Sequence, residues 1–394
     1  MAVRKLKDRI FEVGAIDWDR ELFDELVHLP DGTSYNAYLV QGSEKTALID
    51  TVDPDKEKVL IQNLMTVHPK RIDYLISNHA EQDHSGSIPK ILELHPETMV
   101  VTNAKCKAML VDHLHVPEDR FIVIKDRETL SLGDKTLEFI LTPWVHWPET
   151  MATYLQEDKI LFPCDFFGAH RAASNLFVTK ESKVYYGAKR YYAEIMMPFR
   201  AIIKKHLKVL KDYDIEMIAP SHGPVYDRPS FIMDAYRDWV SDEVKNKVLI
   251  PFVSMHGSTR AMVDHLTGAL IDRGIKVKLF NLVKADMGEY AMDIVDAATV
   301  VFGTPFVLVG AHPAVVYAAY FTGALRAKIK HVGIMASYGW GGKVVEQVRS
   351  LIEPVKAEHF EPILSKGLPD KEDFQKIDAL ADIILERHQS LNIL

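Results

Sequence analysis

Apolar positions along the chain form two successive patterns, and the change between them lies near residue 245. In the first part, short apolar runs of strand length such as Ile72–Ile76 alternate with helical patterns. In the second part, fully apolar runs such as Val248–Val253 are each followed by a helix, as in parallel sheets buried on both faces. We therefore predict two domains, 1–244 and 245–394, with the charged segment Ser241–Lys247 at their boundary.

Side chains that bind metals follow the predicted strands of the first domain. Four of them fall within the six residues that come soon after the strand Ile72–Ile76, and three more each follow a later strand. They are His79, Glu81, Asp83 and His84, then His146, Asp165 and His222. A loop with two histidines and two carboxylates favours iron, manganese or zinc. The alternative is a polar, helix-capping surface loop that binds no metal. Seven ligands are more than the four that one tetrahedral zinc needs, so the pattern suits two metals.

The second domain predicts a doubly wound sheet of five parallel strands with helices between them. In such sheets ligands bind at the carboxyl ends of the strands. Three loops occupy those ends: Ser254, Met255, His256, Gly257, Ser258 and Thr259; Thr304, Pro305 and Phe306; and Ser337, Tyr338, Gly339, Trp340, Gly341 and Gly342. The first suits a phosphate group, although it matches neither the P-loop nor the dinucleotide pattern. The third offers aromatic surface beside glycines, which suits a flat flavin ring.

Composition narrows the class of protein. The chain has 394 residues and a formal net charge of −8, which disfavours nucleic acid and anionic membranes as partners. Its two cysteines, Cys106 and Cys164, cannot form a disulfide framework, which is typical of a reducing compartment. The N-terminus lacks a secretory pattern, so we expect the protein in the cytoplasm. Residues 297–325 carry no Asp, Glu, Lys or Arg, but Gly303–Pro305 and His312–Pro313 interrupt them, so we expect buried strand and helix rather than a membrane span.

The ligand order resembles the metallo-β-lactamase fold, whose hydrolases usually carry His-x-His-x-Asp-His. Here Glu81 replaces the second histidine. Together with Tyr35–Tyr38, His146–Pro148 and the flavodoxin-like tail, this replacement makes the whole chain similar to the flavodiiron proteins, also called A-type flavoproteins. The resemblance implies an N-terminal αββα sandwich, a C-terminal flavodoxin-like domain, and FMN and two iron ions as cofactors.

The resemblance also implies roles for single residues. One iron would take His79, Glu81 and His146, and the other Asp83, His84 and His222, with Asp165 bridging. In some members the residue matching His84 swings away from the iron. His170 and Tyr192 match residues close to the iron pair. One departure from the family is the stretch Pro305–His312, which is more apolar than usual and weakens the expected polar contacts to the flavin.

The implied activity is reduction of dioxygen to water or of nitric oxide to nitrous oxide. A rubredoxin domain needs four cysteines, so the donor would be a separate molecule, either rubredoxin or reduced coenzyme F420. The family assembles as a head-to-tail homodimer, alone or as a dimer of dimers, with FMN of one chain facing the iron pair of the other. The sequence leaves open the choice of oxygen or nitric oxide and the donor.

Two alternatives belong to other classes. One is a metallo-hydrolase that uses its flavodoxin domain for regulation or docking, which predicts zinc and turnover independent of flavin. The other is a flavodoxin-like electron carrier with a structural metal domain, which predicts a closed metal site. Metal content and a flavin spectrum separate all three.

Overall fold

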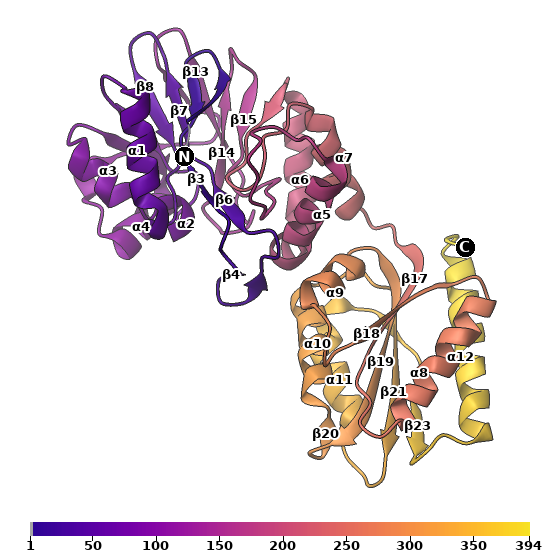
Figure 1. Cartoon of the computed structure of the whole chain (residues 1–394). Helices are drawn as coiled ribbons and strands as arrows, with labels where there is room; N and C mark the ends of the chain where they lie inside the picture. Colours follow the sequence, from indigo (N-terminus) through magenta and orange to yellow (C-terminus); the bar gives the residue numbers. More distant parts are fainter. Residues whose placement is uncertain (1–2) are drawn as a thin grey trace. The chain divides into compact units, whose positions relative to one another are not determined.

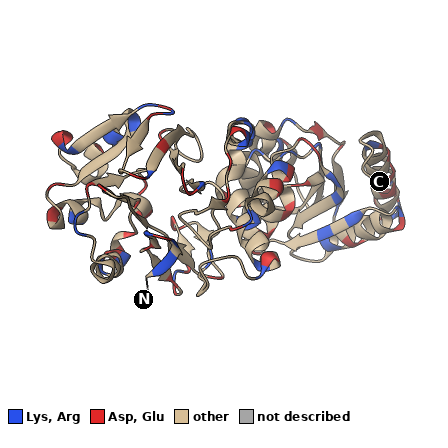
Figure 2. Ribbon diagram, turned by 90° about the horizontal axis from the view of Figure 1, so that it is seen from above, with Lys and Arg blue, Asp and Glu red and all other residues tan. Residues whose placement is uncertain are grey.

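The computed structural model describes residues 3–394 and divides them into two compact units, one ending at Val240 and the other beginning at Ser241 (Figure 1). The division falls within four residues of the 244/245 boundary expected from the sequence. Within residues 3–394, no helix is both long and apolar enough to cross a membrane. Acidic and basic residues are interspersed along the ribbon of each unit (Figure 2).

The N-terminal unit is built on two sheets that pack face to face. The first has the order β1-β2-β7-β8-β9-β10-β11 and the second β12-β13-β14-β15-β16. The strands of the first are Arg4–Lys7, Ile10–Glu12, Tyr38–Gln41, Thr46–Ile49, Tyr74–Ile76, Met99–Asn103 and Phe121–Ile124, and those of the second are Thr129–Ser131, Thr136–Leu141, Met151–Leu155, Ile160–Phe162 and Met217–Ile218. Two small antiparallel sheets of two strands each pair β3 (Ala15–Asp17) with β6 (Thr33–Tyr35) and β4 (Leu22–Phe23) with β5 (Val27–His28).

Alternation along the strands explains why the first sheet is covered on both sides. In β7, Tyr38 and Val40 enter the core between the two sheets, while Leu39 enters the core beneath the helices. In β8, Ala47 and Ile49 likewise enter the core between the sheets, and Leu48 enters the core beneath the helices. Successive side chains of a strand point to opposite faces, so an unbroken apolar run requires cover on both.

Helices form the outer layers of this sandwich. The first sheet is covered by α1 (Glu57–Val67), α3 (Ile88–Leu94) and α4 (Ala104–Leu114), which supply Leu60, Ile91 and Leu110 to its outer core. Further helices lie beside the second sheet (Figure 1). They are α5 (Glu181–Tyr191), α6 (Arg200–Val209) and α7 (Pro229–Trp239). This arrangement confirms the predicted αββα sandwich.

The C-terminal unit is a parallel sheet with helices on both faces. Its order is β18-β17-β19-β21, followed by β22 and β23, which both pair with β21. The strands are β17 (Lys245–Phe252), β18 (Lys276–Asn281), β19 (Ala297–Val307), β20 (Gly310–Ala311), β21 (His331–Tyr338), β22 (Glu358–His359) and β23 (Ile363–Lys366). The parallel order, with the last strand split in two, is the 2-1-3-4-5 order of flavodoxin-like folds and confirms the prediction.

Apolar residues of β17 and the flanking helices hold this unit together. Val248, Ile250 and Phe252 pack with Met262 and Leu266 of the next helix. The helices are α8 (Ser258–Asp272), α9 (Met287–Ile294), α10 (Pro313–Ala324), α11 (Val344–Ile352) and α12 (Lys371–Ser390). The charge-free stretch 297–325 becomes the buried strand β19 and the helix α10, as expected.

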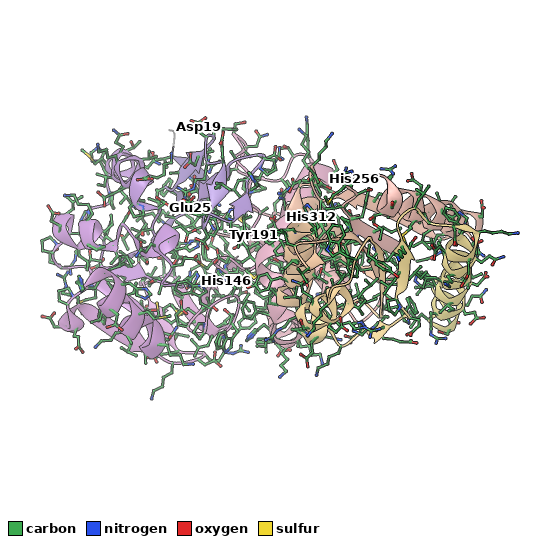
Figure 3. All side chains as sticks on the ribbon, turned by 90° about the horizontal axis from the view of Figure 1, so that it is seen from below. Asp19, Glu25, His146, Tyr191, His256 and His312 are labelled. Carbon is green, nitrogen blue, oxygen red and sulfur yellow. The ribbon has the colours of Figure 1, made fainter. Side chains whose placement is uncertain are left out.

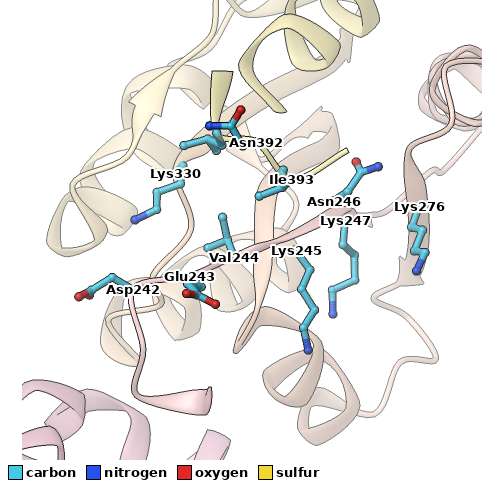
Figure 4. Close-up of a pocket in the computed structure, with 11 residues that line it drawn as sticks. Asp242, Glu243, Val244, Lys245, Asn246, Lys247, Lys276, Lys330, Asn392 and Ile393 are labelled. Atoms are coloured by element: carbon cyan, nitrogen blue, oxygen red, sulfur yellow. The ribbon is translucent and has the colours of Figure 1, made fainter. Parts of the chain in front are cut away.

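A cavity of about 940 Å³ lies at the amino ends of this sheet (Figure 4). Lys245, Lys276 and Lys330 line it. Cofactors of such sheets bind at the opposite, carboxyl end, so this cavity is not the expected flavin site. Lys245 is already paired with Asp296 at 3.0 Å, which lowers the positive charge that the cavity offers.

Candidate metal and cofactor sites

The seven predicted metal ligands come together at one end of the N-terminal sandwich. Each lies where the chain leaves a strand or in the short turn or helix that follows. His79 follows β9; Glu81 precedes and Asp83 and His84 belong to α2 (Gln82–Ser85); His146 lies between β13 and β14; Asp165 follows β15; and His222 follows β16. Strand ends from both sheets thus bring together residues that are up to 143 positions apart in the sequence, from 79 to 222.

The first group of ligands faces one oxygen of Asp165. Glu81 Oε2 lies 3.0 Å from Nε2 of His79 and 3.0 Å from Nε2 of His146. The same two nitrogens lie 3.4 Å and 3.3 Å from Asp165 Oδ2. Four potential ligand atoms therefore surround one point.

The second group faces the other oxygen of the same carboxylate. Nε2 of His84 lies 3.0 Å from Asp165 Oδ1, and Nε2 of His222 lies 3.3 Å from it. The two oxygens of Asp83 lie 3.2 Å from these nitrogens, one beside each. His84, expected to be the most variable ligand, points inward here.

Burial makes this cluster unstable without cations. Asp165, His84 and His222 are each 1% exposed. Both oxygens of Asp83 and of Asp165, together with Nε2 of His84 and of His222, have no hydrogen-bond partner despite their short mutual distances. Buried carboxylates that lack partners are costly, and coordination to metal ions is a common remedy. The residues present therefore fit a pair of metal ions.

In the metal-free protein, protons take the place of metal cations. Burial alone would lower the pKa of His146, but the facing carboxylates of Asp165 and Glu81 outweigh it and raise that pKa to about 9. Burial would also lower the pKa of His222, but the facing carboxylates of Asp165 and Asp83 outweigh it and raise that pKa to about 10. Burial favours a neutral Asp165, yet the facing histidines hold its pKa well below the usual range. Metal binding must displace these protons.

Several residues that the sequence analysis did not single out hold the ligands in place. Glu149 Oε1 lies 2.7 Å from Nδ1 of His79, and the backbone oxygen of Ser34 lies 2.7 Å from Nδ1 of His222. Asp50 accepts hydrogen bonds of 2.8 Å from the backbone and side chain of Asn78. The only sequence signal for Glu149 is its position three residues after His146.

His170 lies beside the cluster, and the tyrosine that contacts His170 is Tyr191 rather than Tyr192. The His170 ring lies 4.5 Å from His222 and 4.9 Å from Tyr191. Tyr192, expected there, packs on Tyr236 at 5.4 Å, and its hydroxyl donates to the backbone oxygen of Trp239. This corrects the expectation for Tyr192. Figure 3 labels Tyr191 and His146, which belong to the same unit.

The three predicted flavin loops meet at the carboxyl end of the parallel sheet. Thr259 Oγ1 of the first loop lies 2.9 Å from Ser337 Oγ of the third. The ring of Phe306 in the second loop lies 5.4 Å from that of Tyr338 in the third. The structure therefore gathers the three segments into one surface.

The first loop ends at the start of helix α8. Gly257 takes a φ of +92°, and Ser258 begins the helix. Ser254 Oγ accepts a 3.1 Å hydrogen bond from the backbone nitrogen of Arg260. Met255 and His256, the latter labelled in Figure 3, lie in the turn between them. The N-terminus of a helix, with backbone N–H groups free, suits a phosphate.

The second segment is not a loop, which corrects the expectation for Thr304–Phe306. Strand β19 continues through it to Val307 and turns back into β20 as a hairpin. Leu308 and Val309 form the turn with φ values of +50° and +65°, and their side chains are 83% and 69% exposed. The third loop packs against this hairpin at Gly342, where a Cβ atom would lie 2.7 Å from the Val309 backbone oxygen.

Comparison with protein families finds a match within the first unit. Residues 33–223 match the family described as ODP family beta lactamase. This segment contains all seven predicted metal ligands and both sheets from β7 onward.

Comparison with whole proteins covers both units. The nitric oxide reductase of Moorella thermoacetica is 35% identical, over 97% of this chain and 98% of that protein. The rubredoxin oxygen:oxidoreductase of Desulfovibrio gigas superposes with a TM-score of 0.95 and 30% identity over 100% of both chains. The flavodiiron protein of Giardia intestinalis superposes with a TM-score of 0.92 and 26% identity, covering 99% of this chain and 97% of that one.

Proposed function

This chain belongs to the flavodiiron proteins, which makes it an oxidoreductase with FMN and a diiron centre, and we propose that it reduces dioxygen to water, nitric oxide to nitrous oxide, or both. The observation that carries the proposal is the position of Asp165. Its two oxygens each lie within 3.4 Å of a different pair of histidine nitrogens. One carboxylate between two ligand groups is what a two-metal centre requires.

We assign His79, Glu81 and His146 to one iron, Asp83, His84 and His222 to the other, and Asp165 to the bridge. Support comes from two groups of close ligand atoms, one of His79, Glu81, His146 and Asp165 and the other of Asp83, His84 and His222. An iron pair bound there, together with reduced flavin, would supply the electrons that these reductions consume. Glu81 favours iron over zinc because it replaces a softer imidazole by a hard, anionic oxygen.

We assign the flavin to the surface formed by three segments, Ser254–Thr259, Thr304–Phe306 and Ser337–Gly342. The first would hold the phosphate at the start of α8. The aromatic rings of Phe306, Tyr338 and Trp340 would border the isoalloxazine ring. Trp340 is 71% exposed, which leaves its ring available for contact with a ligand or a second subunit.

We propose that electrons reach the flavin from a separate donor, rubredoxin or reduced coenzyme F420, in the cytoplasm. The 394 residues contain two cysteines, and both are free, so they cannot form the four-cysteine site of rubredoxin. We further propose a head-to-tail homodimer, alone or as a dimer of dimers. Only residues 240–244 separate α7 from β17, and so short a link restricts how freely one chain could fold its flavin onto its own metal site.

For the test, the protein is first reduced under anaerobic conditions with each donor in turn. Pre-reduced protein is mixed with dioxygen or with nitric oxide, and flavin reoxidation is followed by absorbance. The proposal predicts reoxidation by at least one of the two gases within the time of a single turnover. Failure with both gases, in protein that carries iron and FMN, would contradict it.

A further inference from the structure

The histidines of the metal cluster differ in what holds their second ring nitrogen. Nδ1 of His79 meets a carboxylate, Glu149, at 2.7 Å, and both side chains are fully buried. Nδ1 of His222 meets a neutral backbone oxygen, that of Ser34, also at 2.7 Å. Nδ1 of His84 is buried and has no hydrogen-bond partner. The two ligand groups are thus supported unequally.

Glu149 is held so that it can serve only His79 and its neighbour. Its Oε1 also accepts a 3.0 Å hydrogen bond from the backbone nitrogen of Ala80. The side chain of Asn103 donates a 2.6 Å bond to the Glu149 backbone oxygen and fixes the main chain at that point. The second carboxylate oxygen of Glu149, Oε2, is buried without a hydrogen-bond partner. Among residues 3–394, no lysine or arginine pairs with this carboxylate, so His79 is its one basic neighbour.

The hydrogen bond decides which nitrogen of His79 faces the cluster. A carboxylate oxygen only accepts, so Nδ1 must donate, and the lone pair is left on Nε2. Nε2 lies 3.0 Å from Glu81 Oε2 and 3.4 Å from Asp165 Oδ2. An anionic partner also makes the imidazole a stronger electron donor than a carbonyl does, and a missing partner leaves it weakest.

We propose that Glu149 is a positioning residue that makes the first metal position, with His79, Glu81 and His146, bind its ion more tightly than the second. The proposal rests on the two-metal assignment above. It concerns the order in which the metals bind and leave: the second position, whose His84 ring lacks support at Nδ1, would empty first.

The test is a titration of metal-free protein with Co²⁺, followed by the visible absorption of the bound ion. We expect two steps in the unmodified protein, with the weaker one lost in His84→Ala. Glu149→Gln keeps the shape but removes the charge, and we expect the tighter step to weaken by about 10- to 100-fold while the weaker step stays within a few-fold.

Thr150→Val is the matched control. Thr150 Oγ1 donates to the backbone oxygen of Thr142 at 2.6 Å and stabilises the same loop without touching His79. We expect this variant to lower thermal stability while leaving the tighter step nearly unchanged. If Glu149→Gln fails to fold, Glu149→Asp, which is too short to keep the 2.7 Å contact, carries the same expectation.

Two results would overturn the proposal: equal weakening of both steps in Glu149→Gln, or an effect in Thr150→Val as large as that in Glu149→Gln. A single binding step in the unmodified protein would instead contradict the two-metal assignment itself. The two failures are therefore distinguishable, and neither readout depends on catalytic activity.

Discussion

Asp165 is the residue on which the metal site depends most. Its side chain is almost fully buried, and its oxygens are the atoms that the two ligand groups share. His84, by contrast, offers its Nε2 to the second group alone and lacks a hydrogen bond at Nδ1. Loss of a shared ligand should affect both metals, whereas loss of a terminal ligand should affect one at most.

We therefore expect Asp165→Ala to lower bound iron from about two per chain to near zero, because a two-metal centre needs its bridge. The matched variant His84→Ala should keep at least about one iron per chain, as the first group stays complete. Iron analysis of both purified variants measures this. Retention of both irons in Asp165→Ala would remove that residue from the bridge.

Glu81 should determine the choice of metal. Glu81→His restores the ligand pattern of zinc hydrolases, so zinc should displace most of the iron and reduction of oxygen should fall by roughly two orders of magnitude or more. Metal content after growth with both ions present, measured beside the unmodified protein, tests this. A variant that keeps iron and full activity would show that ligand identity at residue 81 does not select the metal.

The protonated histidines predict how the metal-free protein responds to pH. The folded pKa of His146 is about 9 and that of His222 about 10, both above the ordinary value of 6.5. Their contribution to stability is thus complete below pH 6.5 and is lost as pH rises through 9 and 10. Between pH 6.5 and 9.5 these two titrations together correspond to a loss of roughly 6 kcal/mol, so we expect the Tm of the metal-free protein to fall by about 10 °C or more. Thermal melts measure it, and the iron-loaded protein, in which metal replaces these protons, should show a much smaller change.

At the residue scale, the gathering of the metal-binding side chains could be predicted and the residues that support them could not. His79 to His84 are metal-binding types crowded into six positions, which is visible in the sequence. Glu149 looks like an ordinary loop carboxylate until folding places it against His79. Tyr191 and Tyr192 are adjacent, and which of them faces His170 depends on the rotation of the helix just before it widens into the π-helical turn Tyr192–Met196.

At the scale of elements, the hairpin β19–β20 is the main departure from expectation. The sequence predicts a loop after Phe302 because Gly303, Thr304 and Pro305 interrupt the apolar run. The strand continues because Thr304 and Pro305 pair in register with Ala336 and Ser337 of β21. Its turn uses Leu308 and Val309 at positive φ, where glycine or asparagine is the usual signal, so the turn could not be recognised.

The contact between this hairpin and the third loop should matter for flavin binding. A Cβ at Gly342 would lie 2.7 Å from the Val309 backbone oxygen and 3.2 Å from the Phe306 ring, whereas one at Gly341 would meet no atom within 4 Å. Overpacking of this kind costs about 1–3 kcal/mol. We therefore expect Gly342→Ala to weaken FMN binding by roughly tenfold or more, and Gly341→Ala to change it by less than about threefold.

Fluorescence titration of flavin-free protein with FMN measures both affinities. Equal affinities for the two variants would show that the hairpin and the third loop do not jointly form the flavin site.

At the scale of the whole molecule, the two-part organisation could be predicted because each part has its own periodicity. Alternating strands and helices with buried parallel runs after residue 245 specify a doubly wound sheet. The assembly of chains is a separate question, because each unit carries one of the two proposed cofactor sites. A closed head-to-tail pair would bring the flavin of one chain to the metal site of its partner, with each contact made twice.

Mixing two inactive variants tests that assembly. His79→Ala removes a predicted iron ligand, and Gly342→Trp should block the flavin surface with a bulky ring. Refolded together, they should form mixed dimers that contain one intact pair of cofactors across the chains and regain up to about one quarter of the normal activity, since about half of randomly formed dimers are mixed and each holds one of two pairs. No recovery in proven mixed dimers would mean that both cofactors of a working pair lie in one chain.

The central claim is that one chain holds an iron pair bridged by Asp165 and one FMN. Its most direct test is iron, zinc and flavin analysis of anaerobically purified protein, combined with a Mössbauer spectrum after growth on ⁵⁷Fe. We expect about two irons and one FMN per chain, and in the oxidised protein a spectrum of two magnetically coupled ferric ions, because a shared carboxylate would join them. Zinc in place of iron, or two uncoupled iron signals, would contradict it.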